Sequence, residues 1–462
     1  MPEKKTILIT ISRAIIARNL LINQFADILN KKYRVILVTP FLDNQDFVSK
    51  FGSLEMAPLF PIMYSGIRGS ISNIFLAIHK ALIYNPTVEI RSKYGDICRS
   101  KAVRFKFVRH LIQKYIFGTL LCNNFFRLLF KKIDALCLPC NLYDAFLEKY
   151  RPDLVFITSI GSDDEAALLR NCKNNGIKSV AMAKSWDNCS KIGFREIADR
   201  FVVWSEYMRE EAIKFQCYTS EQIEIVGIPQ FDSYCNLPIP DKAIFFKKYG
   251  LDLNKKLIFF GSEGPISDDP EKNKDYVVSF IKEKIIDGTL KDYQILVRPH
   301  FSYINDFDRF NILADGELVF VDKDYVRSNS KDGIELSLNN IINLMGAVKY
   351  SDAIVVGAST LILDVIANSK MPIIYGFDRT EDTPKYDSVK RFFEYLWMKN
   401  LLAVGLDNVA KSREQLIDKI KNFSRLNELK QKEKELVESR FCYRLDGLSG
   451  KRLFGFIDKL LN

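Results

Sequence analysis

The sequence predicts an α/β protein made of two Rossmann-like, doubly wound parallel-sheet domains that face a central cleft, with a helical insertion in the first domain. Its 462 residues exceed the roughly 250–300 at which a single core stops growing, so two domains are expected. Short apolar runs alternate with stretches whose apolar residues have helical spacing, which is the pattern of parallel strands covered by helices. A proline-rich segment at 229–240 interrupts this alternation and is predicted to be the interdomain linker.

The first domain is predicted over residues 1–232 and is expected to bind the acceptor. It opens with a strand at 5–11, a helix at 14–30 and a strand at 33–39, and the first turn of this βαβ unit lacks the GxGxxG of a dinucleotide fold. Further strands are expected at 154–158, 179–183, 200–204 and 223–226.

The second domain is predicted over residues 233–440 and is expected to bind the nucleotide of the donor. Its strands are expected at 257–260, 293–297, 318–321, 353–356 and 372–375. A C-terminal helix is predicted at 441–462, and its return to the first domain is one expected path of the chain.

The insertion, at about 60–135, is rich in aromatic and basic residues. We favour a helical subdomain that packs on the first sheet and turns a basic face outward. The alternative is an amphipathic helix pair at a membrane surface. The residues behind both interpretations are Arg104, Lys106, Arg109, Arg127, Lys131 and Lys132, with Phe105, Phe107, Tyr115, Phe125, Phe126 and Phe130.

The composition narrows the class of partner. The formal net charge of +10 favours anionic partners such as nucleotides or phospholipid head groups. Nucleic acid is not expected, because no nucleic-acid-binding module accompanies the charge. No apolar run approaches the ~20 residues that span a bilayer, and no signal peptide is visible. The nine scattered cysteines suit a reducing compartment, so a cytoplasmic protein is expected, with the cytoplasmic face of the membrane as one location.

Candidate donor-binding residues follow the strands of the second domain, where ligands of open α/β sheets bind. The turn that contains Gly357, Ser359 and Thr360 precedes a helix that carries Asp364. Such a turn offers backbone N–H groups and two hydroxyls to a phosphate, and the alternative is an ordinary helix cap by Ser359 or Thr360.

Two other strands of this domain are followed by candidate residues. Arg298 and His300 flank Pro299 after the strand at 293–297; an arginine can bind phosphate and a histidine can move a proton. Ser262 lies in a glycine-containing turn after the strand at 257–260.

Candidate acceptor-side residues follow strands of the first domain. Lys184, Ser185, Asp187 and Asn188 surround Trp186 in one turn. Asp163 begins a helix and is a candidate base or an ordinary capping acid. Arg18 and Asn19 lie in the first helix and are expected to face the other domain.

Neither of two DxD sequences predicts a metal site. We interpret Asp306-Phe-Asp308 and Asp322-Lys-Asp324 as solvated charges. No metal or other cofactor is expected, since cationic side chains and helix N-termini can offset the charge of a leaving diphosphate.

The segment Asp352-Ala-Ile-Val-Val-Gly-Ala-Ser-Thr-Leu-Ile-Leu-Asp364, followed by Lys370-Met-Pro-Ile-Ile, resembles the nucleotide-binding end of GT-B transferases. It is most similar to CDP-glycerol glycerophosphotransferase-like and surface-polysaccharide transferases, which have Asp-Tyr-Ser-Ser where this chain has Gly-Ala-Ser-Thr. The Arg298-Pro299-His300 turn resembles their Arg/Lys-Pro-His element, which contacts donor phosphates. Val226-Gly-Ile-Pro-Gln-Phe-Asp232 is similar to their Gly-x-Pro-x-x-Asp segment. The resemblance covers mainly 150–380 and implies a GT-B fold, a nucleotide-linked donor, metal independence and a role in capsule or cell-surface glycan assembly.

These features predict a metal-independent GT-B glycosyltransferase that moves a sugar from a nucleotide-activated donor to a surface-polysaccharide or lipid-linked glycan acceptor. Arg298 and His300 would neutralise the leaving group, and Asp163 or Asp187 would take the proton of the acceptor hydroxyl. Three alternatives stay open: a CDP-glycerol-type glycerophosphotransferase, a nucleotide-sugar 2-epimerase, and a non-catalytic nucleotide-binding or membrane-surface scaffold.

Overall fold

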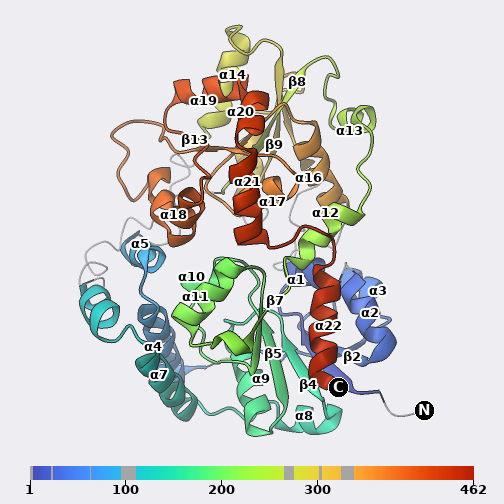
Figure 1. The fold of residues 1–462 in the computed structure, drawn as a ribbon, viewed down its shortest axis with the longest axis vertical. Coiled ribbons are helices and arrows are strands. Elements are labelled where there is room, and N and C mark those ends of the chain that lie inside the picture. The colour runs from blue at the N-terminus through green and yellow to red at the C-terminus, as the bar shows by residue number, and fades with distance from the viewer. Residues whose placement is uncertain are drawn as a thin grey trace.

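Two α/β domains stand one above the other in the computed structural model (Figure 1). The structure describes residues 4–21, 24–62, 64–94, 111–264, 275–300, 304–323 and 338–462. None of the helices described there is long and apolar enough to cross a membrane.

Within these residues, the first domain holds a seven-stranded parallel sheet of order β3-β2-β1-β4-β5-β6-β7. Its inner strands are buried along almost their whole length, because helices cover both faces of a doubly wound sheet. The strands are β1 (Thr6–Thr10), β2 (Arg34–Thr39), β3 (Glu55–Pro58), β4 (Leu154–Ile157), β5 (Lys178–Met182), β6 (Arg200–Val203) and β7 (Ile223–Ile225).

The helices of this domain follow the predicted alternation, with one difference. The helix expected at 14–30 is instead a short α1 (Ala14–Ile16), a π-helical η1 (Ala17–Leu21) and a separate α2 (Gln24–Lys32). The others are α3 (Gln45–Phe51), α8 (Asp144–Tyr150), α9 (Asp163–Asn174), α10 (Asn188–Lys191), α11 (Glu206–Gln216) and η4 (Ser220–Gln222).

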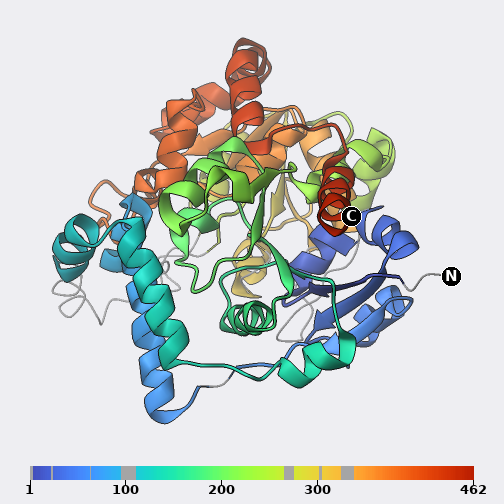
Figure 2. The ribbon, with the colours of Figure 1, turned by 60° about the horizontal axis from the view of Figure 1, so that its bottom comes forward.

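The insertion is helical, and its two longest described helices, α4 and α7, lie side by side (Figure 2). It contains α4 (Gly66–Leu82), α5 (Pro86–Tyr94), η3 (Gln113–Leu120) and α7 (Asn124–Cys137). The predicted residues Arg104, Phe105, Lys106, Phe107 and Arg109 lie outside the described part of the chain.

The predicted basic outer face of the insertion is wrong for two of its residues, Arg127 and Lys131. Both are buried on α7, where Arg127 Nε donates to the carbonyl oxygen of Leu82 at 3.0 Å and Lys131 donates to that of Phe194. The physical reason is that the charged side chains lie on the inward face of α7. Backbone carbonyl groups and the buried carboxylate of Asp134 stabilise their positive charges there.

The second domain repeats the topology of the first. In the described residues its six parallel strands have the order β10-β9-β8-β11-β12-β13, which is the Rossmann order when counted from β8. The two sheets confirm the predicted GT-B fold class. The strands are β8 (Lys256–Gly261), β9 (Tyr293–Arg298), β10 (Val319–Val321), β11 (Ala353–Val356), β12 (Ile373–Tyr375) and β13 (Val409–Ala410).

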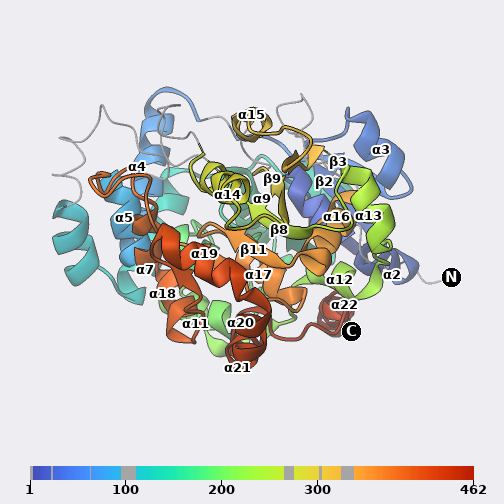
Figure 3. The same cartoon turned by 90° about the horizontal axis from the view of Figure 1, so that it is seen from above.

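Helices cover both faces of this second sheet. Seen from above, α14 (Val277–Ile286) and α15 (Ile304–Asn311) lie on one side of the strands, and α16 (Leu338–Tyr350), α17 (Leu361–Ala367) and α19 (Arg413–Lys421) lie on the other (Figure 3). The remaining helices are α13 (Lys242–Tyr249), η7 (Val389–Glu394), α18 (Leu396–Ala403), α20 (Phe423–Leu429), α21 (Gln431–Val437) and η8 (Glu438–Cys442).

Two segments join the domains. The linker forms η5 (Pro229–Phe231) and α12 (Asp232–Asn236), and the last helix, α22 (Ser449–Leu461), lies against α2 of the first domain (Figure 1). The carboxylate of Asp232 accepts the N–H groups of Ser449 and Gly450 at 2.9 and 2.7 Å, so it caps α22. The aspartate of the Gly-x-Pro-x-x-Asp segment therefore joins the linker to the C-terminal helix.

Candidate active site

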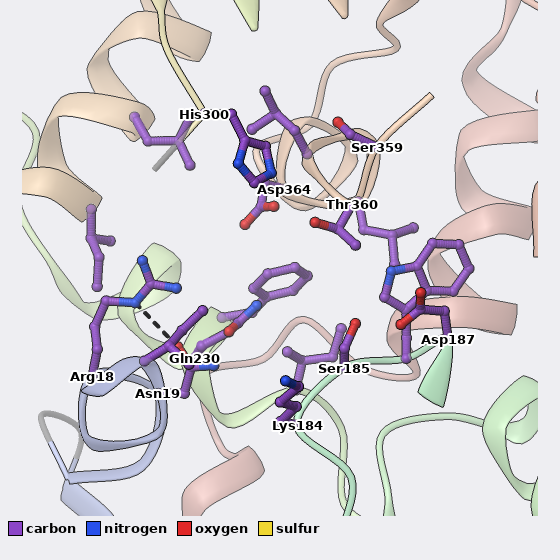
Figure 4. A pocket seen from close by; sticks show the side chains of 18 of the residues that line it. Arg18, Asn19, Lys184, Ser185, Asp187, Gln230, His300, Ser359, Thr360 and Asp364 are labelled. Atoms are coloured by element: carbon purple, nitrogen blue, oxygen red, sulfur yellow. Dashed lines mark hydrogen bonds between the residues drawn. The ribbon is translucent and has the colours of Figure 1, made fainter. Parts of the chain in front are cut away.

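A cavity of about 410 Å³ lies between the domains, where strands of both sheets end. Figure 4 shows side chains from both domains pointing into it. The predicted residues that line it are Arg18, Asn19, Lys184, Ser185, Asp187, Asn188, Ser262, Arg298, His300, Ser359, Thr360 and Asp364. Gly357 and Asp163 do not line it.

The lining of this cavity is positively charged. The cationic side chains are those of Arg13, Arg18, Lys184, Lys191 and Arg298, and the acidic ones are those of Asp187 and Asp364. Burial, together with the charges of Arg13 and Lys191, lowers the pKa of Lys184. This crowding of cations favours the binding of an anion between the two domains.

The turn before α17 offers hydroxyls to a ligand. Thr360 is the N-cap residue of α17, but its side chain makes no capping hydrogen bond. The hydroxyl of Ser359 is inaccessible to solvent and has no hydrogen-bond partner among the described residues. Neither Ser359 nor Thr360 therefore caps α17 through its side chain, contrary to the alternative interpretation.

Gly357 has a packing role beside this turn. A β-carbon at this position would lie 2.4 Å from Oε2 of Glu263, so only glycine lets the two turns pack together. Gly357 thus lets Glu263 pack directly against the turn that contains Ser359 and Thr360.

Arg298 is held firmly at the end of β9. Its Nη1 donates to Oδ2 of Asp322 at 2.9 Å, and its Nη2 donates to Oδ1 of Asn340. The prediction that Asp322 is a solvated charge is wrong, because the carboxylate is buried as the counter-charge of a buried guanidinium. Asp324 lies outside the described residues.

His300 is fixed by the other DxD sequence. Its backbone N–H donates to Oδ2 of Asp306 at 2.5 Å. Asp306 is buried and also pairs with Arg309, so the prediction that it is solvated is wrong too. Asp308 is part of α15 but not of the cavity lining.

The imidazole of His300 is neutral at neutral pH. Burial lowers its pKa to about 4, although the charge of Asp306 acts in the opposite direction. A neutral imidazole carries no positive charge to offset a leaving phosphate, but one of its nitrogens can accept a proton and the other can donate a hydrogen bond. A charged imidazolium that neutralises the leaving group is therefore not expected at neutral pH, and the catalytic role of His300 stays a prediction.

The two predicted acidic bases differ in position. Asp187 lines the cavity and is buried; burial is the largest influence on its pKa and raises it, but Lys191, whose Nζ lies 3.2 Å from Oδ2, together with Ser185 and Arg91 makes the net shift downward. Asp163 pairs with Arg195 at 2.8 Å outside the lining. Of the two predicted bases, Asp187 is therefore the one that lies at the cavity.

The remaining predicted residues make local contacts. Arg18 Nε donates to Oδ1 of Asn19 at 3.2 Å (Figure 4). The hydroxyl of Ser262 accepts the N–H of Gly264 at 3.0 Å. Asp364 accepts a hydrogen bond from the hydroxyl of Tyr234 at 2.5 Å; burial raises the pKa of Asp364, and Tyr234 and the nearby Arg18 lower it.

Sequence reasoning missed Tyr234 and Lys191. Tyr234 belongs to the linker, where no strand end pointed to it. Lys191 lies four residues after Asp187, and this i,i+4 spacing was a signal that could have found it. In the described residues, no three His, Cys, Asp or Glu side chains group as a metal site.

The family model of CDP-glycerol:poly(glycerophosphate) glycerophosphotransferases matches residues 174–459. The chain belongs to this family. It is thus a transferase of GT-B type that uses a nucleotide-activated donor. Comparison with curated protein sequences gives no match.

Solved structures share the fold at low sequence identity. The UDP-GlcNAc 2-epimerase of Neisseria meningitidis, bound to UDP-GlcNAc, is 11% identical, with 98% of this chain and 100% of that chain covered and a TM-score of 0.53. A putative UDP-N-acetylglucosamine 2-epimerase of Listeria monocytogenes is 10% identical, with 99% and 97% covered and a TM-score of 0.50. The wall teichoic acid polymerase TagF is 12% identical, with 99% and 89% covered and a TM-score of 0.48.

The family match covers all the cavity residues of the second domain, including His300 and the turn before α17. It also includes Lys184–Asn188 of the first domain, whereas Arg13, Arg18 and Asn19 precede it. The residues that precede the match come from the domain that we expect to bind the acceptor.

Replacing Ser359 and Thr360 together with alanine is expected to weaken nucleotide binding by about 10-fold or more. A hydrogen bond to a charged group contributes about 1.5–3 kcal/mol, and 1.4 kcal/mol corresponds to tenfold in affinity. Calorimetry with nucleoside diphosphates measures the change, with the exposed Ser49→Ala on α3 as the matched control. Wild-type affinity in the double variant would remove this turn from the phosphate site.

Proposed function

We propose that the chain transfers a phosphorylated polyol from a CDP-linked donor to a hydroxyl group of a surface polymer, without a metal ion. The observation that carries the proposal is the cation-lined cavity between the domains, which the neutral imidazole of His300 and the turn of Ser359 and Thr360 both line. The family description supports a CDP-activated polyol phosphate over the sugar that the sequence favoured.

In the proposed reaction, the oxygen of the acceptor hydroxyl attacks the phosphorus that carries the polyol. The new P–O bond forms as the bond to the other phosphate of the donor breaks, and CMP leaves. His300 Nδ1 or Nε2 takes the proton of the hydroxyl, which needs a neutral ring.

The side chains around the cavity would stabilise the charge that develops during transfer. Lys184 and Arg18 face it from the first domain, and Arg298 faces it from the second. Positive groups that are fixed before the reaction, in a site that excludes water, are effective because they need little reorganisation. Such a lining would offset the charge of the leaving nucleotide without a metal ion.

Product analysis tests this function. The protein is incubated with a glycerophosphate oligomer and either CDP-glycerol or a nucleotide sugar, and products are followed by phosphorus NMR and mass spectrometry. We expect CMP and a new phosphodiester from CDP-glycerol, with activity unchanged by EDTA. Release of a nucleoside diphosphate from a nucleotide sugar, with no reaction of CDP-glycerol, would favour sugar transfer instead. Epimerised nucleotide sugar without an acceptor would indicate an epimerase, and loss of activity in EDTA that Mg²⁺ restores would contradict the metal-free mechanism.

We also propose that the insertion binds an anionic membrane surface. Its exposed apolar side chains would make the contact with the lipid. Helix α7 has charged residues on its buried face, whereas Phe125 and Leu136 are 68% and 79% exposed. Ile67 and Ile74 on α4 are exposed as well. Contiguous exposed apolar groups of this kind mark interaction sites.

The charge of the insertion supports a lipid surface as the partner. The segments α4, η3 and α7 contain one acidic residue, Asp134, and it is buried. Arg68 and Lys132 are exposed, so the outward surface combines apolar side chains with cations, as interfacial helices do.

Replacing Leu129 and Leu136 with serine and Lys132 with glutamate is expected to lower binding to phosphatidylglycerol vesicles by about tenfold or more, because each buried CH₂ contributes ~0.8 kcal/mol. Vesicle flotation measures it. The matched control is Leu429→Ser with Lys432→Glu on the exposed surface of the second domain. Equal flotation of the two variants would contradict the proposed contact.

A further inference from the structure

A buried ionic cluster lies behind the cavity, in the second domain. Arg309 on α15 is its centre: Nη1 lies 3.3 Å from Oδ1 of Asp306, and Nη2 lies 3.9 Å from Oδ1 of Asp275. The side chains of Asp306 and Asp275 are 0% and 2% exposed. Glu263 is a third acid near this guanidinium, and burial raises its pKa although Arg309 lowers it. None of these four residues lines the cavity.

Each contact of Arg309 leads to a different turn of the donor site. Through Asp306, it reaches the backbone N–H of His300. Its Nη1 also donates to the carbonyl oxygen of Gly264 at 3.3 Å, in the turn that begins at Ser262. The third turn is reached by charge and packing: the charge of Glu263 acts on Arg309, and Glu263 packs against Gly357 beside the turn of Ser359 and Thr360.

Such a cluster is a poor source of stability. Removing several charges from water costs free energy that their attraction does not reliably restore, so an apolar group of the same size is often as stable. The cluster is also incompletely bonded: Nε of Arg309 and Oε2 of Glu263 are inaccessible and have no hydrogen-bond partner among the described residues. A function in positioning accounts for this arrangement better than one in stability.

We propose that Arg309 is a positioning residue of the donor site, which holds the turns at Ser262–Gly264, Pro299–His300 and Gly357–Thr360 in one arrangement. It does not touch the donor but fixes the backbone of the groups that do. The proposal rests on the proposed function only in calling the ligand of these turns a nucleotide donor.

Three variants test the proposal: Arg309→Met removes the charge, Arg309→Lys keeps it, and Asp306→Asn removes the carboxylate that holds His300. Arg413→Met is the matched control, because its guanidinium stacks on the ring of Phe280 at 5.3 Å, as that of Arg309 stacks on the ring of Phe310 at 4.5 Å, and it does not line the cavity. Circular dichroism and thermal unfolding select folded variants. Calorimetry with CDP and with CDP-glycerol measures nucleotide affinity without requiring transfer.

The second readout is the NMR titration of the histidine rings. The chain has three histidines, so His300 is assigned by its loss in His300→Gln. The charges of Asp306 and Arg309 of α15 act on this ring, and Asp364 of α17 lies beside it (Figure 4). Arg309 lowers the pKa of His300 and Asp306 raises it, so Arg309→Met should raise the titration midpoint and Asp306→Asn should lower it.

We expect Arg309→Met to weaken nucleotide binding about tenfold, which is ~1.4 kcal/mol, and Arg309→Lys to recover most of it. Folded variants with wild-type affinity and an unmoved His300 midpoint would overturn the proposal. If Arg309→Met does not fold, the other two variants decide. Asp306→Asn must lower both the titration midpoint of His300 and the nucleotide affinity. An Asp306→Asn variant with the wild-type midpoint and affinity would overturn the proposal. If nucleotide affinity and the His300 midpoint both shift in the variants, but the protein transfers no group from any donor, the positioning role of Arg309 is supported and the proposed function is rejected.

Discussion

Replacing His300 with alanine is expected to lower the turnover number by about 10²-fold or more, because a positioned proton acceptor contributes 10²–10⁴-fold to a rate. Affinity for the donor should change far less, since the ring acts on the proton of the acceptor hydroxyl. Single-turnover kinetics with CDP-glycerol measure the chemical step. His300→Gln is the informative partner variant, because glutamine retains hydrogen bonding but cannot take a proton.

The pH dependence of this step has a defined sign. With a pKa of about 4, the imidazole of His300 is neutral throughout the neutral range and gains a proton only as the pH falls towards that value. The rate should therefore be independent of this group between about pH 6 and 8 and should decline in acid. An unchanged rate in His300→Ala, or an acid limb that this variant retains, would remove His300 from proton transfer.

The doubly wound fold could be predicted because its signal is local. Strands that are buried on both faces read as continuous apolar runs, and β1, β4, β8 and β11 have this property. The edge strands β3 (Glu55–Pro58) and β13 (Val409–Ala410) were missed, because a short strand at an edge buries few apolar side chains. Their existence depends on the neighbouring strands and not on their own sequence.

The cavity lining was predictable for a related reason. In open α/β sheets the carboxyl ends of the strands meet, so residues such as Lys184 and His300, far apart in sequence, were expected on one cleft. The surroundings of a single carboxylate were not predictable in this way. The sequence predicts that Asp322 and Asp306 are solvated, but their partners are a guanidinium and a backbone N–H that only the folded chain brings to them.

Helix α7 shows a further limit of sequence patterns. Arg127, Lys131 and Asp134 are spaced so that they share one face, and Leu128 and Leu136 lie on another. Periodicity reveals that the helix has two faces but not which of them is buried. A charged face can be the inner one when every charge on it finds a partner, as Asp134 does.

Replacing Asp134 with alanine is expected to destabilise the first domain by about 3–5 kcal/mol. This carboxylate is fully buried; Oδ2 lies 2.9 Å from His79 Nε2 and 3.2 Å from Arg170 Nη2, and Oδ1 lies 2.6 Å from Arg195 Nη2. Its removal leaves two buried guanidinium groups without their shared counter-charge. Thermal and urea unfolding of the full chain measure the loss, with Asp407→Ala as the control, because Asp407 is 66% exposed and its pairing with Lys430 should contribute little.

The pKa of Asp134 determines how the loss of stability in Asp134→Ala depends on pH. Burial alone would raise its pKa, but His79 and Arg195 hold the pKa of Asp134 well below its ordinary value. The folded state therefore binds this proton less readily than the unfolded state, and the stabilisation is present above the ordinary pKa of aspartate and is lost as the pH falls below it. The difference in unfolding free energy between the protein and Asp134→Ala should be constant near neutral pH and should shrink in acid. A difference that is small at pH 7, or that grows as the pH falls, would show that the charges of Arg170 and Arg195 are stabilised without Asp134.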